Sequence, residues 1–328
     1  MPTRLLSQRD VALALAGVDA LRTTEQALRA HGTGDAVMPA KVGLDLSRSG
    51  RPNWMNSMPG YLPELGVAGL KWAGGFVENP RRFGLPYIMA ILVLLDPDTG
   101  RVLAVLEAGT ITSARTGAAT AVAAKWLAVP DAARVGLVGA GAQARTSLAH
   151  LVRVRPIREV RVFDAAPGAA DRFCDEMASV APAADLRVVP SVADAVARAD
   201  VVVTATWADE PLVDADDLAP TAFVASLGSH QELAPAVVLE ADKVVCDHWE
   251  QCTHRGELER LVAEGRFTRR DLWAELGDVV AGKVAGREPG DGRIVASLVG
   301  MATEDVALGK AVYDRAVELG LGTEFAFV

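Results

Sequence analysis

The pattern of hydrophobic and polar residues changes partway along the chain, and each part predicts a different kind of sheet. Before residue 128, helical spacing over residues 18–30 gives way to short strands, of which residues 87–95 form a long, central one. From residue 134 onward, apolar runs of strand length alternate with segments at helical spacing. Such runs are typical of strands buried on both faces of a parallel sheet. We therefore predict an α/β fold, with a doubly wound, Rossmann-type parallel sheet after a smaller α+β part.

The spacing of hydrophobic residues predicts the following strands and helices. The first part has strands over 41–46, 67–72, 87–95 and 101–106, with an alanine-rich helix over 113–127. The second part has strands over 135–138, 159–163, 200–206 and 221–227, and helices over 142–154 and 169–180. Asp10 is expected to cap a first helix over 11–16, and the last segment, 304–318, is again helical.

Length and charge narrow the function classes. At 328 residues the chain is expected to hold two domains, and half of it is apolar with 23% charged residues, as in soluble globular proteins. A formal charge of −9 argues against a nucleic acid or an anionic membrane as partner. The longest apolar run, over residues 85–95, is too short for a bilayer span. Because the N-terminus also lacks the pattern of a signal peptide, we expect a cytoplasmic protein.

The three cysteines fit a reducing compartment and do not form a disulfide framework. Cys246, Cys252 and His254 lie close together, which raises the possibility of a metal site. Zinc sites, however, need a fourth ligand and usually pair cysteines at a tighter spacing. We therefore predict no metal, with Cys246 at the end of a strand and Cys252 on the following helix.

A glycine motif carries the clearest chemistry. Gly139-x-Gly141-x-x-Ala144 follows a predicted strand and opens a helix, where Gly139 allows a tight turn and Gly141 lets a pyrophosphate approach the backbone. The next strand ends in Asp164, 25 residues after Gly139, where a carboxylate would hold ribose hydroxyls and repel a 2′-phosphate. The motif predicts NAD, with NADP less favoured. Structural glycines in an ordinary βα turn are the alternative.

Two basic residues precede this motif. Lys71 ends an apolar strand among small residues, either exposed with its stem packed or directed into a cleft as a charge. Arg115 lies near the expected start of the alanine-rich helix, where the helix dipole disfavours a cation. An anion bound by both residues would explain these positions.

Several ordered motifs accompany these residues along nearly the whole chain: Lys71-Trp with Asn79-Pro80, Asp96-Pro97-x-Thr-Gly100, Gly109-Thr-x-Thr-x-x-Arg115-Thr116, the glycine motif, Glu232-Leu233, Gly256-Glu257-Leu258 and Gly300-Met-Ala-x-x-Asp305. Through them the chain resembles the ornithine cyclodeaminase/mu-crystallin family. The resemblance implies a homodimer, with a substrate-binding and dimerisation domain over 1–128 completed by 305–328, and a Rossmann domain over 129–304. Members include NAD(P)-dependent amino-acid dehydrogenases, imine reductases, cyclodeaminases and a thyroid-hormone-binding crystallin.

The resemblance also assigns roles to single residues. It implies that Lys71, Arg115, Lys41 and Met58 meet the substrate, with Arg115 gripping its carboxylate. The expected dinucleotide contacts are Thr116, Gly139, Gly141, Ala142, Gln143, Ala144, Asp164, Thr206 and Gly228. His230 stands in a shortened loop where cyclodeaminases carry a catalytic aspartate, so Lys71 and His230 are the catalytic candidates.

Departures from the family pattern guide the functional hypothesis. Asn56 replaces the glutamate with which ornithine cyclodeaminase handles the distal amine, and Leu298 replaces a cofactor-contacting serine. The leading hypothesis is an NAD-dependent oxidoreductase acting on the C–N bond of a small carboxylate-bearing amino or imino acid. A redox-neutral cyclodeaminase and a non-catalytic, crystallin-like binder of a dinucleotide or small ligand are the alternatives.

Overall fold

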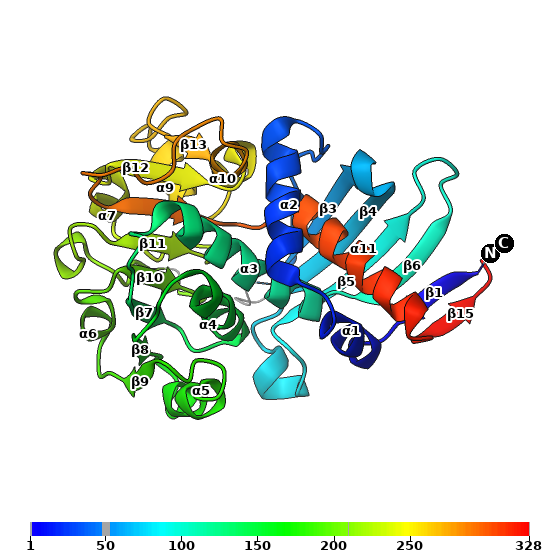
Figure 1. Ribbon diagram of the computed structural model, residues 1–328, viewed down its shortest axis with the longest axis horizontal. Helices are drawn as coiled ribbons and strands as arrows, with labels where there is room; N and C mark the ends of the chain where they lie inside the picture. Colours follow the sequence, from blue (N-terminus) through cyan, green and yellow to red (C-terminus); the bar gives the residue numbers. More distant parts are fainter. Residues whose placement is uncertain (1, 48–52, 209, 328) are drawn as a thin grey trace. The chain divides into compact units, whose positions relative to one another are not determined.

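The computed structural model describes residues 2–47, 53–208 and 210–327, and the chain forms two compact units (Figure 1). Unit 1 comprises Met1–Arg115 and Met301–Val328, so that both ends of the chain contribute to it. Unit 2 comprises Thr116–Gly300. Within the described residues, no helix is both long and apolar enough to cross a membrane.

Unit 2 is built on an eight-stranded sheet in which every pair of neighbours is parallel, in the order β13-β12-β14-β11-β10-β7-β8-β9. Its strands are β7 (Arg134–Val138), β8 (Glu159–Phe163), β9 (Asp185–Val188), β10 (Val201–Thr204), β11 (Phe223–Ser226), β12 (Lys243–Cys246), β13 (Ala274–Glu275) and β14 (Ile294–Ser297). The strand order reverses direction at β7, because β8 and β9 lie on one side of it and β10 lies on the other. The predicted doubly wound, Rossmann-type fold is therefore confirmed.

The central strands of unit 2 are buried along their whole length, which explains their continuous apolar pattern. The helices of the unit are α4 (Ala142–Val154), α5 (Ala169–Met177), α6 (Val192–Val196), α7 (Pro235–Leu239), α8 (Trp249–Cys252), α9 (Glu257–Ala263), α10 (Leu276–Val280) and the C-terminal part of α3 (Gly109–Leu127). A Cβ atom on Gly117 of α3 would overlap the backbone of Thr146 in α4. These two helices therefore pack backbone against backbone.

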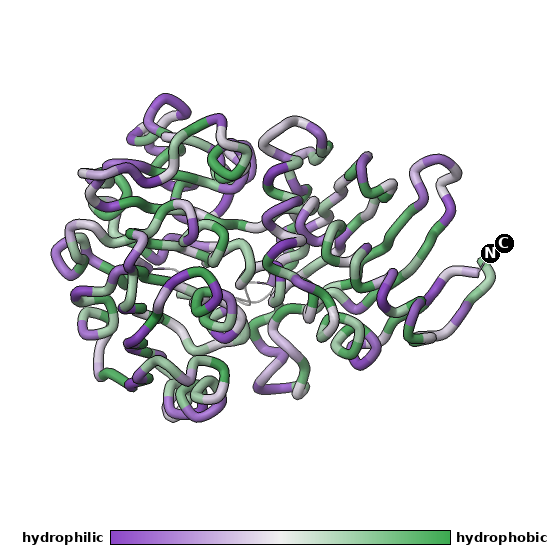
Figure 2. The backbone as a smooth tube through the Cα atoms, in the orientation of Figure 1, coloured by the Kyte–Doolittle hydropathy of each residue, from purple (hydrophilic) through white to green (hydrophobic). Residues whose placement is uncertain are grey.

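Unit 1 contains a seven-stranded mixed sheet in the order β15-β1-β6-β5-β4-β3-β2, parallel between β1 and β6 and antiparallel elsewhere. Its strands are β1 (Thr3–Leu6), β2 (Val42–Asp45), β3 (Trp54–Leu62), β4 (Val67–Gly75), β5 (Ile88–Leu95), β6 (Val102–Glu107) and β15 (Thr323–Phe325). Strands β5 and β6 are hydrophobic along their length, and the turn between them is hydrophilic (Figure 2).

Three helices cover one face of this sheet: α1 (Gln8–Leu15), α2 (Ala20–Thr33) and α11 (Ala302–Glu318). Helix α11 contacts β3, β4 and β5, while α1 and α2 pack against α11 (Figure 1). Leu92 and Leu94 point toward α11, because a side chain at Gly309 of that helix would overlap Leu92. Successive strand residues face opposite sides, so Met89 and Ile91 lie on the other face, where they are exposed.

Two local predictions in unit 1 were wrong. The cap of α1 is Ser7, whose hydroxyl accepts from the Asp10 backbone N–H, and Asp10 occupies the reciprocal position of a capping box. Helix α3 begins at Gly109 rather than at residue 113, with its first amides bound by the Glu107 carboxylate. Arg115 therefore lies in the second turn of α3, beyond the short range of the helix dipole. The unfavourable dipole expected at Arg115 does not apply.

Candidate active site

Lys71 is buried within unit 1 and faces helix α11. Its strand, β4, runs so close to α11 that a Cβ at Gly69 would lie 2.8 Å from a methyl of Val306. Lys71 is two residues along, on the same side of the strand, and only 1% of it is exposed. Its Nζ lies 2.5 Å from Oδ2 of Asp305 and 3.4 Å from Oγ1 of Thr112. The lysine is thus an internal charge and not a surface residue with a packed stem.

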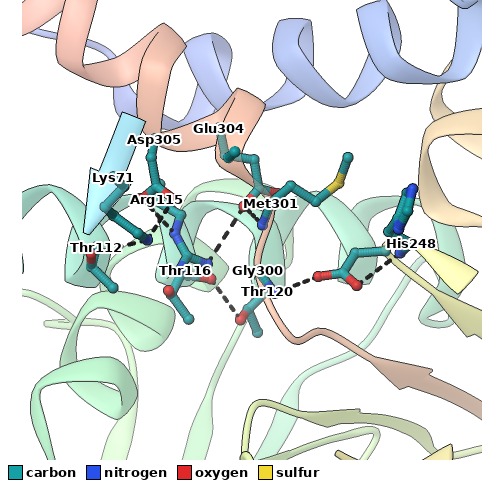
Figure 3. A network of polar contacts seen from close by, with 12 residues as sticks. Lys71, Thr112, Arg115, Thr116, Thr120, His248, Gly300, Met301, Glu304 and Asp305 are labelled. Atoms are coloured by element: carbon teal, nitrogen blue, oxygen red, sulfur yellow. Dashed lines mark hydrogen bonds and ion pairs between the residues drawn. The ribbon is translucent and has the colours of Figure 1, made fainter. Parts of the chain in front are cut away.

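Arg115 meets the same carboxylate from helix α3 (Figure 3). Its Nε donates to Oδ1 of Asp305 at 3.1 Å, and its Nη1 lies 3.5 Å from Oε2 of Glu304. Arg115 is 6% exposed, and both carboxylates are buried in the first turn of α11. One carboxylate therefore holds both cations, one on each oxygen.

The electrostatics of this cluster favour proton exchange near neutral pH. Burial disfavours the charged ammonium and is the main reason why the pKa of Lys71 falls to about 8. The Asp305 carboxylate opposes that decrease, and the Arg115 guanidinium adds to it. Two basic and two acidic side chains thus meet in this buried cluster.

The other predicted substrate residues lie on neighbouring strands of unit 1. Met58 on β3 pairs directly with Lys71 on β4 and is 4% exposed. Asn56, two residues earlier on β3, is also buried. Lys41 comes just before β2, which pairs with β3, and is half-buried. The structure therefore brings Met58 to Lys71, and Lys41 directly precedes Val42, which pairs with Ser57 beside Met58.

In unit 2, the two glycines of the motif differ in whether the fold itself requires glycine. Gly139 has φ of +96°, and a Cβ there would lie 2.7 Å from the Ala205 carbonyl oxygen, so the fold itself requires glycine. Gly141 precedes α4 with φ of −83°, and a Cβ there would meet open space. The fold does not require glycine at Gly141, whereas a pyrophosphate at the amide end of α4 would.

Asp164 stands at the end of β8 and binds the glycine loop. Its Oδ2 accepts from the Ala140 N–H at 2.7 Å, and its Oδ1 accepts from the Ala166 N–H at 2.8 Å. The carboxylate is only half-buried, which suits contact with ribose hydroxyls as well. Arg145, which sequence reasoning missed, donates to the loop carbonyls of Ala140 and Gly141 and pairs with Glu176.

Of the other expected cofactor residues, Ala142 is exposed, Gln143 is half-buried, and Ala144 is buried where α4 meets the sheet. Thr116, on α3, is buried. The remaining two, Thr206 and Gly228, lie on loops after β10 and β11, at the carboxyl ends of the parallel strands. That edge of a doubly wound sheet is where ligands bind.

Glu232, which sequence reasoning also missed as a site residue, fixes these two loops. Its Oε1 accepts from the Thr206 N–H and hydroxyl at 2.7 and 2.6 Å, and its Oε2 accepts from the Gly228 N–H at 3.0 Å. Burial raises the pKa of Glu232 despite these donors. Behind it, Ser226 bridges to the carboxylate of Glu257, whose pKa burial raises to about 8.

His230 is exposed on the loop after β11, between Gly228 and Glu232. The neighbouring Gln231 side chain is buried, and its Nε2 has no hydrogen-bond partner among the described residues. A catalytic role for His230 stays a prediction.

Cys246 ends β12, and Cys252 lies on α8, as predicted. Both thiols are buried and free, and burial raises the pKa of Cys246 well above its ordinary value. Among the described residues, no three His, Cys, Asp or Glu side chains are grouped so that they could hold a metal ion. Cys246 and Cys252 both belong to a hydrophobic core cluster of unit 2.

Residues 1–320 match the family model described as the ornithine cyclodeaminase/mu-crystallin family. The chain belongs to this family. The resemblance predicted from the motifs is thereby confirmed.

Relatives in this family are similar over the full length of the chain. Alanine dehydrogenase of Archaeoglobus fulgidus is 35% identical over 337 residues, which cover 100% of this chain and 99% of that protein. The solved structure of an archaeal alanine dehydrogenase dimer with bound NAD is 34% identical, with a TM-score of 0.92 and full coverage of both chains. The Δ1-pyrroline-2-carboxylate reductase of Thermococcus litoralis, solved with NADH and L-proline, is 31% identical. Its TM-score is also 0.92, over 98% of this chain and 99% of that one.

Proposed function

We propose that this member of the ornithine cyclodeaminase/mu-crystallin family is an NAD-dependent oxidoreductase acting on the C–N bond of a small amino or imino acid. Relatives that match most or all of the chain include dehydrogenases and reductases of such compounds, so the predicted enzyme class is confirmed at this level. Within the chain, the observation that carries the proposal is the buried pair of cations, Lys71 and Arg115, on the shared carboxylate of Asp305.

The substrate side is assigned to Arg115 and Lys71. A planar guanidinium matches a carboxylate with two parallel N–H bonds, so Arg115 would orient the acid group. Reduction of an imine also requires a proton at nitrogen, and a group with a pKa near the working pH delivers it best. With its pKa at about 8, Lys71 suits that role better than the exposed His230. Met58, beside Lys71, would line the pocket for a small side chain.

The cofactor side is assigned to residues of unit 2 that fit a dinucleotide. Gly141 leaves open space at the amide end of α4 for a pyrophosphate, and the half-buried carboxylate of Asp164 is available to ribose hydroxyls. Glu232 holds the Thr206 and Gly228 loops in place at the edge where a nicotinamide would lie. NAD supplies the hydride when bound, and the protein supplies orientation and charge.

The quaternary structure and domain roles are part of the proposal. The face of the unit 1 sheet turned away from α11 exposes Leu70, Met89 and Ile91, which is an unusual cluster for a surface in water. A second copy of the chain would cover this face in a homodimer. We assign substrate binding and dimerisation to the domain over 1–128 and 305–328, and NAD binding to the domain over 129–304. A cytoplasmic location stays a prediction.

An NADH turnover assay separates the proposal from its alternatives. The protein is incubated with NADH and a panel of Δ1-pyrroline-2-carboxylate, other cyclic imines, and 2-oxo acids with ammonia or methylamine. Oxidation of NADH supports the oxidoreductase. Release of ammonia from diamino acids without a net change in NADH would replace it with a cyclodeaminase. Tight NADH binding with neither reaction would replace it with a binding protein of the crystallin kind.

A further inference from the structure

Asp305 contacts both substrate-side cations, and the proposed function gives it no catalytic or binding role of its own. It lies in the first turn of α11 and has no solvent-exposed surface. Each of its two oxygens contacts a different cation. Oδ2 lies 2.5 Å from the Lys71 Nζ, and Oδ1 lies 3.1 Å from the Arg115 Nε. A single rigid carboxylate therefore links β4 and α3 through α11.

We propose that Asp305 is a positioning residue for the reaction, and that it holds Lys71 in place and keeps it protonated for delivery of a proton to the substrate nitrogen. This inference rests on the proposed function, because Lys71 is the proton donor only there. In a reductive turnover, the Nζ–H bond breaks as the N–H bond of the product forms. Bound NADH would supply the hydride for the imine carbon, and solvent would return the proton to Lys71.

Among the groups around Lys71, Asp305 is the one that most favours the charged ammonium. Of the elements packed against Lys71, α11 offers the carboxylates of Asp305 and Glu304, and α3 offers the Arg115 guanidinium and the neutral Thr112 hydroxyl. The flanking strands place the uncharged Met58 and Leu92 opposite it. Glu304 pairs with Arg115 and favours the charged lysine more weakly, so the ion pair with Asp305 makes the larger contribution that offsets the cost of burying the ammonium.

The test is Asp305→Asn, which retains shape and removes charge. An opposite charge at this range shifts a pKa by about 1–3 units, so Lys71 should titrate one or more units lower in the variant. The activity of the wild-type enzyme, measured as kcat/KM, should fall as pH rises through about 8, where Lys71 loses its proton. In Asp305→Asn this basic limb should move to lower pH, with a loss of about tenfold at neutral pH for a two-unit shift. A merely structural role would lower activity equally at every pH.

Two variants on the same helix serve as matched controls. Asp314→Asn removes an exposed carboxylate of α11 that pairs with Lys310, and it should leave the basic limb unchanged. Glu304→Gln removes the buried neighbour that contacts Arg115, and it should move the limb less than Asp305→Asn does. A limb that stays in place in Asp305→Asn, or an equal shift in all three variants, overturns the proposal.

A second readout does not depend on activity. The chain has six lysines, so ¹³C labelling of lysine side chains yields few NMR resonances, and Lys71→Met identifies that of Lys71. This resonance should titrate near pH 8 in the wild type and lower in Asp305→Asn. A Lys71 resonance that titrates at the same pH in Asp305→Asn as in the wild type overturns the proposal. A wild type that turns over no imine but shows this titration would refute the proposed function and leave the charge coupling intact.

Asp305→Glu tests positioning separately from charge. It retains the carboxylate but moves it by the length of one methylene, so Lys71 should titrate close to its wild-type value. The value of kcat should nevertheless fall at every pH, because the ammonium is displaced from the substrate nitrogen. Wild-type kcat in Asp305→Glu would show that Asp305 sets charge alone and would overturn the positioning role.

Discussion

Replacing Gly141 with alanine should damage NADH binding without damaging the fold. The backbone at Gly141 has φ of −83°, which any residue adopts, and a Cβ there meets nothing within 4 Å. The added methyl group would instead lie at the amide end of α4, the place assigned to the pyrophosphate. Gly139→Ala is the contrasting variant, since φ of +96° and the Ala205 carbonyl make alanine costly there before any ligand binds.

The magnitudes follow from these surroundings. A substitution into open space changes the free energy of unfolding by about 0.5 kcal/mol or less, so the ligand-free Gly141→Ala protein should melt close to the wild type. Displacing the pyrophosphate loses one or two charge-assisted hydrogen bonds of about 1.5–3 kcal/mol each. The Kd for NADH should therefore rise by roughly 10- to 100-fold or more. Gly139→Ala should lose both stability and affinity.

Thermal denaturation without ligand and fluorescence titration with NADH measure the two quantities separately. Wild-type affinity for NADH in Gly141→Ala would refute the placement of the pyrophosphate at this loop. A large drop in melting temperature of the same variant would show that the fold itself requires Gly141, and would refute the reasoning from open space at this position.

Three further predictions concern the cofactor, the substrate and the assembly. Because the Asp164 carboxylate repels a 2′-phosphate, kcat/KM should be higher with NADH than with NADPH; a tenfold preference for NADPH contradicts this. Arg115→Lys should raise KM strongly with little change in NADH binding, and Lys71→Ala should also lower kcat, by about 10²–10³-fold; activity of both variants within about threefold of wild type removes them from the site. Sedimentation should show a dimer that Ile91→Glu disrupts, and a stable wild-type monomer at micromolar concentration rules this assembly out.

Much of unit 2 could be predicted from the sequence because its determinants are local. The helix expected over 142–154 and the strand over 159–163 coincide with α4 and β8. The start of α4 is marked by the adjacent glycine motif, and the end of β8 is marked by the end of an apolar run. Both signals lie within a few residues of the boundary that they specify. Strand β3 of unit 1 was missed, since Pro59 and Gly60 interrupt its pattern, although the structure pairs it on both sides.

The polar partners in the site were beyond sequence reasoning because they are distant in the chain. Asp305 is 190 residues from Arg115, and Glu232 binds Thr206 across 26 residues. The dipole argument at Arg115 failed for a local reason, since the helix begins one turn earlier than its apolar pattern does. The sequence led us to expect an anion near Arg115. Only the folded chain shows that α11 provides carboxylates there, those of Asp305 and Glu304.

Transfer of deuterium from NADH to the product tests the central claim most directly. The enzyme is supplied with NADH deuterated on the transferred face of the nicotinamide and with a 2-imino acid, such as Δ1-pyrroline-2-carboxylate, and the amino acid product is analysed by mass spectrometry. We expect one deuterium at the carbon that carries the amino group, and slower formation of this product by Arg115→Lys at low substrate concentration. Bound NADH that transfers no deuterium to any imino acid of the panel would contradict the assignment of this chain as an oxidoreductase.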